Sequence, residues 1–244
     1  MEALYHSETK TIRCIVCTPA TPAPSRVDPG SAGASAHSEY ERRRTAREAR
    51  VKARLGNLVG GVALALAGEQ QTTSAWERGS VGEQKLGDVL NGIDGIAVLH
   101  DRRVPGTRGN IDHIVVAPAG VFVVDAKHYA GLIRIRDRGS FLNRDERLYV
   151  GSRDCSQLAE NMAWQVEAVR DVLNSIFDGG SIPVQAVLCF VDGEWPLIRP
   201  PDSYKGVRLQ GPRSIKKLLA EPGPLDSARI GTIDRAISLA FPGK

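Results

Sequence analysis

At its centre the sequence reads Asn110-Ile-Asp-His-Ile-Val-Val-Ala-Pro-Ala-Gly-Val-Phe-Val-Val-Asp-Ala-Lys127, two apolar runs joined by a Pro118-Ala119 turn. We expect two antiparallel strands here, at 111–117 and 121–126, because short apolar runs bounded by Pro and Gly are typical of a hairpin. Each strand also holds one aspartate where the hydrophobic pattern predicts an apolar residue. These two aspartates are the first candidates for a functional site.

The two aspartates, Asp112 and Asp125, are predicted to face each other. A hairpin that pairs Ala117 with Gly120 places Asp112 directly opposite Asp125, with Cβ atoms about 4.5–5.5 Å apart, and it places Lys127 on the same face. Opposed carboxylates inside apolar strands are unfavourable unless a cation lies between them. A divalent metal ion with oxygen ligands is one such cation. The alternative is an Asp–Lys ion pair, with the other aspartate capping the neighbouring turn.

The flanking sequence predicts an α/β sandwich with a mixed sheet. Apolar residues at helical spacing indicate a helix before the hairpin and a long helix after it, and the apolar run that follows Pro183 indicates a fully buried strand. The order of helix, antiparallel strands, helix and buried strand defines the fold class. The expected helices are 80–92, 156–177, 214–220 and 225–239, and the further expected strands are 96–100, 132–136, 147–150, 184–191 and 207–210.

Glu83 is a third acidic candidate with two possible roles. The pattern Ser80-x-x-Glu83 matches a capping box, in which the glutamate side chain reaches back to the start of the helix. Glu83 also precedes Leu86 by three residues and Leu90 by seven, so it shares the inward face of that helix. Either it caps the helix, or it aims a carboxylate at the water shell of a metal ion.

Three further polar residues lie near these positions. Gln165 falls in the apolar stripe of the long helix, where it either hydrogen-bonds locally, donates to a substrate phosphate or orients a catalytic lysine. His113 is expected to point away from Asp112 and to have a structural or surface role. His128 follows Lys127 directly and is a candidate for contact with a substrate.

The N-terminal part of the chain predicts a basic arm on a flexible segment. Residues 18–38 are rich in Pro, Ala, Ser and Gly, so we expect 1–38 to be flexible. Residues 39–71 read as a helical arm, basic and then apolar, and 72–244 as the main domain with a helical C-terminal tail. The apolar run 58–68 is shorter than the roughly 20 residues of a membrane span and fits a core helix or an interfacial anchor. The basic residues are Arg42, Arg43, Arg44, Arg47, Arg50, Lys52 and Arg54.

Composition excludes several classes of protein. A hydrophobic content of 42% over 244 residues rules out wholesale disorder, and 4 Cys do not make a disulfide framework. Cys14 and Cys17 supply half of the ligands of a zinc site, and we expect incidental thiols there. No phosphate-binding glycine motif follows a strand, and no nucleophile elbow is present. We expect a cytoplasmic protein.

Three segments together resemble the nuclease-related domain (NERD) family of the PD-(D/E)xK nuclease superfamily: Gly82-Glu83, then Asn110-Ile-Asp-His-Ile-Val-Val, then Gly120-Val-Phe-Val-Val-Asp-Ala-Lys-His-Tyr-Ala-Gly131. The resemblance runs from about Trp76 to Phe177, with the strand 184–191 completing the core. It implies a restriction-endonuclease-like core, with a mixed central sheet flanked by helices. It also implies a phosphodiesterase site that depends on Mg²⁺ (or Mn²⁺).

The resemblance assigns a role to each charged candidate. Glu83 matches the acid of the first helix and Asp112 the metal-binding acid of the second strand. Asp125 and Lys127 match the (D/E)xK pair. Mg²⁺ would be held by Asp112, Asp125 and the Ala126 carbonyl, with Glu83 acting directly or through water. Lys127 would position the attacking water and stabilise the developing charge.

The sequence therefore predicts a metal-dependent nuclease acting on DNA, with residues 42–54 attracting the nucleic-acid backbone. Asn161 and Gln165 resemble the family's Asn-Pro-x-x-Gln segment, with Met162 in place of Pro. The alternative is a non-catalytic nucleic-acid-binding or regulatory module that keeps the nuclease fold. The even charge of residues 55–244 favours an enzyme that works with a protein partner. A third possibility is a membrane-surface anchor at 39–68.

Overall fold

The computed structural model describes residues 3–6, 11–14, 27–34, 37–39, 41–42, 45–46, 49, 71–140, 143–177 and 182–243. Of the predicted basic arm, Arg42 is described, and its guanidinium lies 2.6 Å from the Glu39 carboxylate. A two-stranded antiparallel sheet precedes the arm, formed by β1 (Ala3–His6) and β2 (Thr11–Cys14). The apolar run 58–68 lies outside the described residues, as do the arm residues Arg43, Arg44, Arg47, Arg50, Lys52 and Arg54.

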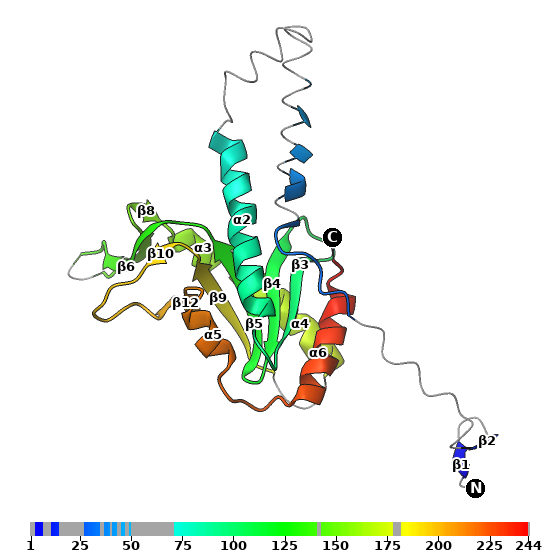
Figure 1. Cartoon of the computed structure of the whole chain (residues 1–244). Helices are drawn as coiled ribbons and strands as arrows, with labels where there is room; N and C mark the ends of the chain where they lie inside the picture. The colour runs from blue at the N-terminus through cyan, green and yellow to red at the C-terminus, as the bar shows by residue number, and fades with distance from the viewer. Residues whose placement is uncertain are drawn as a thin grey trace.

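A mixed sheet of six strands forms the centre of the molecule (Figure 1). The strands β3 (Ala97–Arg103), β4 (Asn110–Ala117) and β5 (Gly120–Lys127) form an antiparallel meander. The next strands, β9 (Val184–Phe190) and β12 (Val207–Gln210), run parallel to β5, and β11 (Ser203–Tyr204) closes the edge. The predicted α/β class with a mixed sheet is confirmed.

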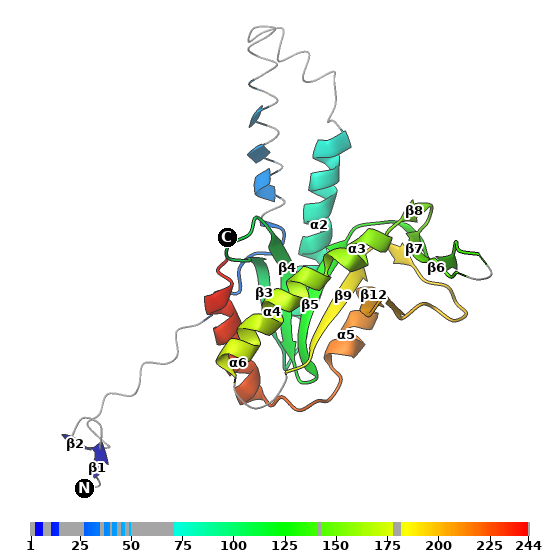
Figure 2. The same ribbon diagram turned by 180° about the vertical axis from the view of Figure 1, so that it is seen from behind.

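Helices cover both faces of this sheet (Figures 1 and 2). One face packs against α2 (Gln71–Asn91) and α5 (Ser214–Leu219), and the apolar residues there include Phe122 and Val124. The other face packs against α3 (Ser156–Asn161), α4 (Ala163–Ile176) and α6 (Ser227–Ala240), and includes Val121 and Val123. This alternation follows from the period of two along a strand. Among the described residues, no helix is long and apolar enough to cross a membrane.

A smaller sheet extends the molecule at the carboxyl ends of β5 and β9. It contains β6 (Gly131–Asp137), β7 (Glu146–Val150), β8 (Arg153–Asp154) and β10 (Gly193–Glu194), in the order β10-β6-β7-β8. The strand β6 follows β5 along the chain and β10 follows β9. The pairing of β10 with β6 therefore joins the two chain segments that leave the central sheet.

The predicted hairpin register is confirmed. Ala117 pairs with Gly120, and the same register continues to His113 and Val124. Gly120 is required at this corner, because its φ is 141° and a Cβ there would lie 2.6 Å from the Pro183 carbonyl oxygen. The tight turn thus sets which residues of β4 and β5 lie side by side.

Two helix predictions are corrected by the structure. The helix expected to begin at Ser80 begins at Gln71, so Ser80 lies inside α2 and the capping-box role of Glu83 is excluded. The helix expected over 156–177 is divided at Met162, which ends α3 and caps α4. The remaining predicted helices and strands agree with the observed ones to within about three residues.

Candidate active site

Three aspartates lie in a row across neighbouring strands. The β4–β5 register that pairs His113 with Val124 places Asp112 beside Asp125. The β3–β4 register pairs His100 with His113 and Arg102 with Ile111, which places Asp101 on the other side of Asp112. Sequence reasoning missed Asp101, because it ended the first strand at His100. The signal that could have found it is the same pairing arithmetic, continued one residue further along β3.

The backbone pairing between β4 and β5 ends at His113 and Val124, just before the two aspartates. There the N–H of Ala126 donates to the Asp112 carboxylate at 3.3 Å. The ammonium group of Lys127 contacts Asp125 Oδ1, and its Nζ also lies 3.3 Å from the Ala126 carbonyl oxygen. Asn110 Nδ2 donates to Asp101 Oδ1 at 3.0 Å. The end of the hairpin is therefore held by side-chain contacts of charged groups.

Glu83 approaches the same place from α2. Its neighbour Gly82 allows close packing of the helix, since a Cβ there would lie 2.8 Å from the Cβ of His128, just after β5. The pKa of the Glu83 carboxyl is raised to about 7, mainly by burial; Lys127 opposes the rise, and Asp101 and Asp125 contribute to it. Glu83 is thus electrostatically coupled to groups on both β3 and β5.

The charges at this end of the sheet are unbalanced. Burial raises the pKa of Asp112 well above its usual value, and the carboxylates of Asp125 and Glu83 raise it further. Burial lowers the pKa of Lys127, but Asp125 and Asp112 outweigh this effect and leave the pKa above its ordinary value. The Lys127 and Asp125 side chains are 22% and 13% exposed, so solvent screens them only in part. The Lys127 ammonium is therefore shared by the carboxyl groups of Asp112, Asp125 and Glu83, and the site favours binding of an additional cation.

The donor atoms suit a hard divalent cation. In the part of the chain that the structure describes, no three His, Cys, Asp or Glu side chains stand arranged to hold a metal ion. Mg²⁺ does not need such a set, because it commonly binds one or two carboxylates and keeps several water ligands. Asp112 and Asp125 supply the carboxylates, and the Ala126 carbonyl supplies a further oxygen. By donor chemistry and by charge, these residues fit the ion.

Gln165 and Asn161, the two residues predicted from the long helix, make no hydrogen bond to the charged cluster among the described residues. Gln165 lies near the start of α4, and its Oε1 is buried with no hydrogen-bond partner among the described residues. Asn161 Oδ1 accepts a hydrogen bond from Gln157 Nε2 at 3.3 Å. The role of Gln165 stays a prediction.

The two histidines have different surroundings. His113 is buried on the opposite face from Asp112, with its Nδ1 2.9 Å from His100 Nδ1, which confirms a structural role. Burial lowers the pKa of His113 to about 3, helped by His100 and Lys127, so the ring is neutral. His128 contacts the carboxylate of Asp192 through Nδ1. Contact of His128 with a substrate stays a prediction.

A mixed α/β sheet with acidic residues and a lysine at the end of its central hairpin defines a nuclease-like core. The family model described as nuclease-related domain (NERD) matches residues 78–191. This part of the chain is therefore a nuclease-related domain, of a family placed in the PD-(D/E)xK superfamily. The match contains Glu83, Asp112, Asp125 and Lys127. No curated protein and no solved structure matches the chain.

Proposed function

We propose that the protein is a metal-dependent nuclease that hydrolyses phosphodiester bonds of DNA in the cytoplasm. The observation that carries this proposal is the meeting of Glu83, Asp112, Asp125 and Lys127 at one end of the β4–β5 hairpin. Buried carboxylates that raise one another's pKa are costly to fold, and such arrangements are concentrated at functional sites. The membership of residues 78–191 in a nuclease-related family supports the same chemistry.

Each residue of the cluster has a role in the proposal. Asp112, Asp125 and the Ala126 carbonyl would hold Mg²⁺ or Mn²⁺, with Glu83 binding directly or through water. When bound, the ion supplies Lewis acidity toward an oxygen of the scissile phosphate. Lys127 stays protonated at neutral pH, because the neighbouring carboxylates raise its pKa. Its ammonium group positions the attacking water and stabilises the negative charge that develops on the phosphorane.

The surface that binds DNA extends beyond this cluster. The basic residues between 42 and 54 supply sequence-independent attraction to phosphates, which salt weakens. Gln165 donates to a substrate phosphate or orients Lys127, and its unpartnered buried Oε1 supports a polar partner there. His128 follows Lys127 directly and would contact the nucleic-acid substrate.

Cleavage assays test the proposal. Linear, supercoiled and branched DNA and RNA would be incubated with Mg²⁺, Mn²⁺ or a chelator. The Asp125→Asn and Lys127→Ala variants would be compared with Asp94→Asn and Lys85→Ala, which make the same charge changes at exposed positions. We expect metal-dependent cleavage of DNA that falls at least about a hundredfold in the first pair and is unchanged in the second.

Other outcomes would identify a different function. Activity that persists in both Asp125→Asn and Lys127→Ala would place the chemistry elsewhere. No cleavage of any substrate, together with salt-sensitive DNA binding, would identify a non-catalytic module that keeps the nuclease fold. Cleavage of RNA alone would correct the substrate.

A further inference from the structure

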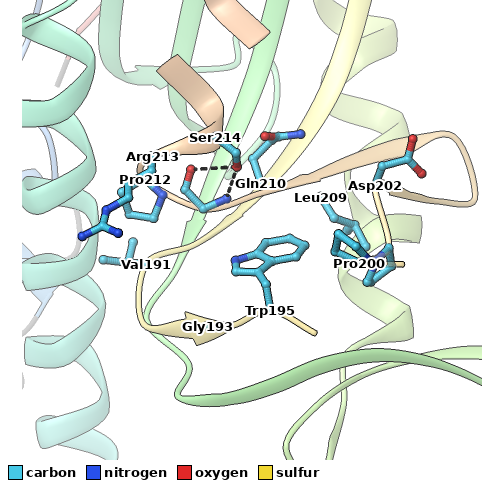
Figure 3. A pocket seen from close by; sticks show the side chains of 12 residues that line it. Val191, Gly193, Trp195, Pro200, Asp202, Leu209, Gln210, Pro212, Arg213 and Ser214 are labelled. Carbon is cyan, nitrogen blue, oxygen red and sulfur yellow. Dashed lines mark hydrogen bonds between the residues drawn. The ribbon is translucent and has the colours of Figure 1, made fainter. Parts of the chain in front are cut away.

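A pocket of about 560 Å³ opens beside the carboxyl ends of β9 and β12 (Figure 3). Its walls are mainly apolar, formed by the Trp195 indole with Val191, Pro200 and Leu209. Figure 3 shows the indole at the centre of the lining, with Leu209 and Pro200 on one side and Val191 on the other. This volume is typical of a pocket for a small organic group.

The pocket adjoins the charged cluster described above. Val191, which lines the pocket, donates its N–H to the Lys127 carbonyl at 2.9 Å. Because β5, β9 and β12 are parallel, their carboxyl ends meet at one edge of the sheet. Two strand spacings separate β5 from β12, a distance of about 10 Å. A nucleotide next to a phosphate held at Lys127 can therefore reach the pocket.

Trp195 is placed to present an aromatic surface. The indole is half-buried and lies against the backbone of Gly211, where a Cβ would come within 3.0 Å of its Nε1. Glycine at this position therefore lets the ring form one wall of the pocket. Aromatic side chains placed in this way stack the bases of single-stranded nucleic acids.

Gln210 supplies the polar part of the pocket. The residue is 6% exposed and lines the cavity. Its side-chain amide both donates and accepts hydrogen bonds, so it suits a partner that offers both an acceptor and a donor. The edge of a nucleobase offers both. Arg213 is an exposed residue of the lining and supplies a cation for a backbone phosphate, and Asp202 is the acidic residue of the lining.

We propose that this pocket receives one unpaired base of the DNA strand, stacked on Trp195 and hydrogen-bonded by Gln210, while an adjoining phosphate lies at Lys127. The inference rests on the proposed nuclease function. A base inside a duplex is stacked and paired and cannot enter such a pocket. The enzyme therefore acts on single strands, frayed ends or junctions with unpaired nucleotides in preference to intact duplex.

Tryptophan fluorescence tests the binding step without requiring catalysis. The chain has 3 Trp, so a Trp76→Phe/Trp164→Phe variant leaves Trp195 as the reporter. The probes are a short oligothymidylate and the same strand with abasic sites, titrated in the presence of a chelator. We expect the oligothymidylate to quench the emission and the abasic strand to bind at least about tenfold more weakly. Absence of quenching, or equal affinity for the two strands, would overturn the inference.

Cleavage kinetics test the same pocket in the working enzyme. Trp195→Ala should raise KM for single-stranded DNA about tenfold with little change in kcat, and Trp195→Phe should restore most of the affinity. Gln210→Leu should alter which base is preferred next to the cut, and the exposed Trp164→Phe serves as the control. The abasic comparison needs no substitution at Trp195, so a folding defect in Trp195→Ala leaves the inference testable.

The two proposals fail in different ways. If the wild type cleaves DNA and Trp195→Ala has the same KM as the wild type, the base pocket is overturned and the nuclease function is not affected. Protein that cleaves nothing, but shows base-dependent quenching, would support the pocket and overturn the catalytic proposal.

Discussion

Individual charges at the end of the β4–β5 hairpin explain both why the site lowers the stability of the fold and which chemistry it can perform. Asp112, Asp125 and Glu83 share one close cation, Lys127, and burial removes much of the water that would otherwise stabilise them. The consequence is a pair of acids, Glu83 and Asp112, whose pKa values lie above the usual range. Stability without metal should therefore depend on pH and on Lys127.

Glu83 should make the metal-free protein less stable as the pH rises. Its pKa lies at about 7 in the folded protein against 4.5 ordinarily, so this carboxyl favours folding fully below pH 4.5 and loses that contribution as the pH rises through 7. As the pH rises from 5 to 8, the free energy of unfolding of the wild type should therefore fall by on the order of 2–3 kcal/mol. This fall should be absent in Glu83→Gln. Urea unfolding in a chelator between pH 5 and 8 measures it. An unchanged pH profile in Glu83→Gln would show that Glu83 is solvated and not part of the cluster.

Lys127 should stabilise the metal-free protein as well as act in catalysis. Lys127→Met leaves Asp125 and Asp112 without their cation, which should cost about 2–3 kcal/mol after allowance for partial exposure. Mg²⁺ should recover part of this loss, because it replaces the missing positive charge. Urea unfolding with and without Mg²⁺ measures both effects, and Lys85→Met on the exposed face of α2 is the control. Equal stability of Lys127→Met and Lys85→Met would be inconsistent with this role.

At the level of elements, the sequence predicted the strands better than the helices. The Pro118-Ala119 turn fixed the hairpin, so the meeting of Asp112 and Asp125 followed from the pattern alone. The start of α2 at Gln71 was missed, because Ser80-x-x-Glu83 imitates a helix start inside α2. The break at Met162 was missed because no Pro or Gly marks it.

Asp101 was missed for a different reason. It continues β3 beyond the apolar run, and its φ of 47° is unusual for a strand residue, although aspartate tolerates it better than most. Its place beside Asp112 depends on the pairing of β3 with β4, which the apolar pattern did not define at this end. The pocket at Trp195 was not predicted either, since it joins residues from β9 to the start of α5.

The packing of α2 on β5 should control activity through Gly82. In Gly82→Ala the new methyl group would meet the His128 Cβ at 2.8 Å, so the helix must shift and carry Glu83 with it. We expect DNA cleavage to fall about ten- to a hundredfold, with a smaller effect on folding. The control is Gly231→Ala inside α6, where nothing lies within 4 Å and stability should rise by about 0.5–1 kcal/mol. Wild-type activity in Gly82→Ala would show that the position of α2 is not critical.

On the scale of the whole molecule, the excess of positive charge lies before the domain. The formal net charge of +4 equals the excess of the segment 39–54, so the rest of the chain is balanced. The distribution of charge along the sequence therefore predicts where nonspecific attraction to DNA should originate. It could not predict the position of this segment relative to the candidate site.

Neutralising the arm should change the salt dependence of DNA binding more than the chemistry. With the seven Arg and Lys residues of 42–54 replaced by Gln, the slope of log affinity against log salt should fall by about 0.7–0.9 for each phosphate that the arm no longer neutralises. Binding measured at several salt concentrations, together with kcat at saturating DNA, separates the two effects. An unchanged slope would mean that the body of the domain alone binds the phosphates.

The metal centre can be tested by calorimetric titration of Mn²⁺ into the wild-type protein and into Asp112→Asn/Asp125→Asn. We expect the wild type to bind one ion per chain and to release protons, because Asp112 and Glu83 hold theirs at unusually high pH. The double variant should bind at least about tenfold more weakly, and Asp94→Asn should bind like the wild type. Equal affinity of the wild type and the double variant, or no binding by the wild type, would contradict a metal-dependent site at the end of the β4–β5 hairpin.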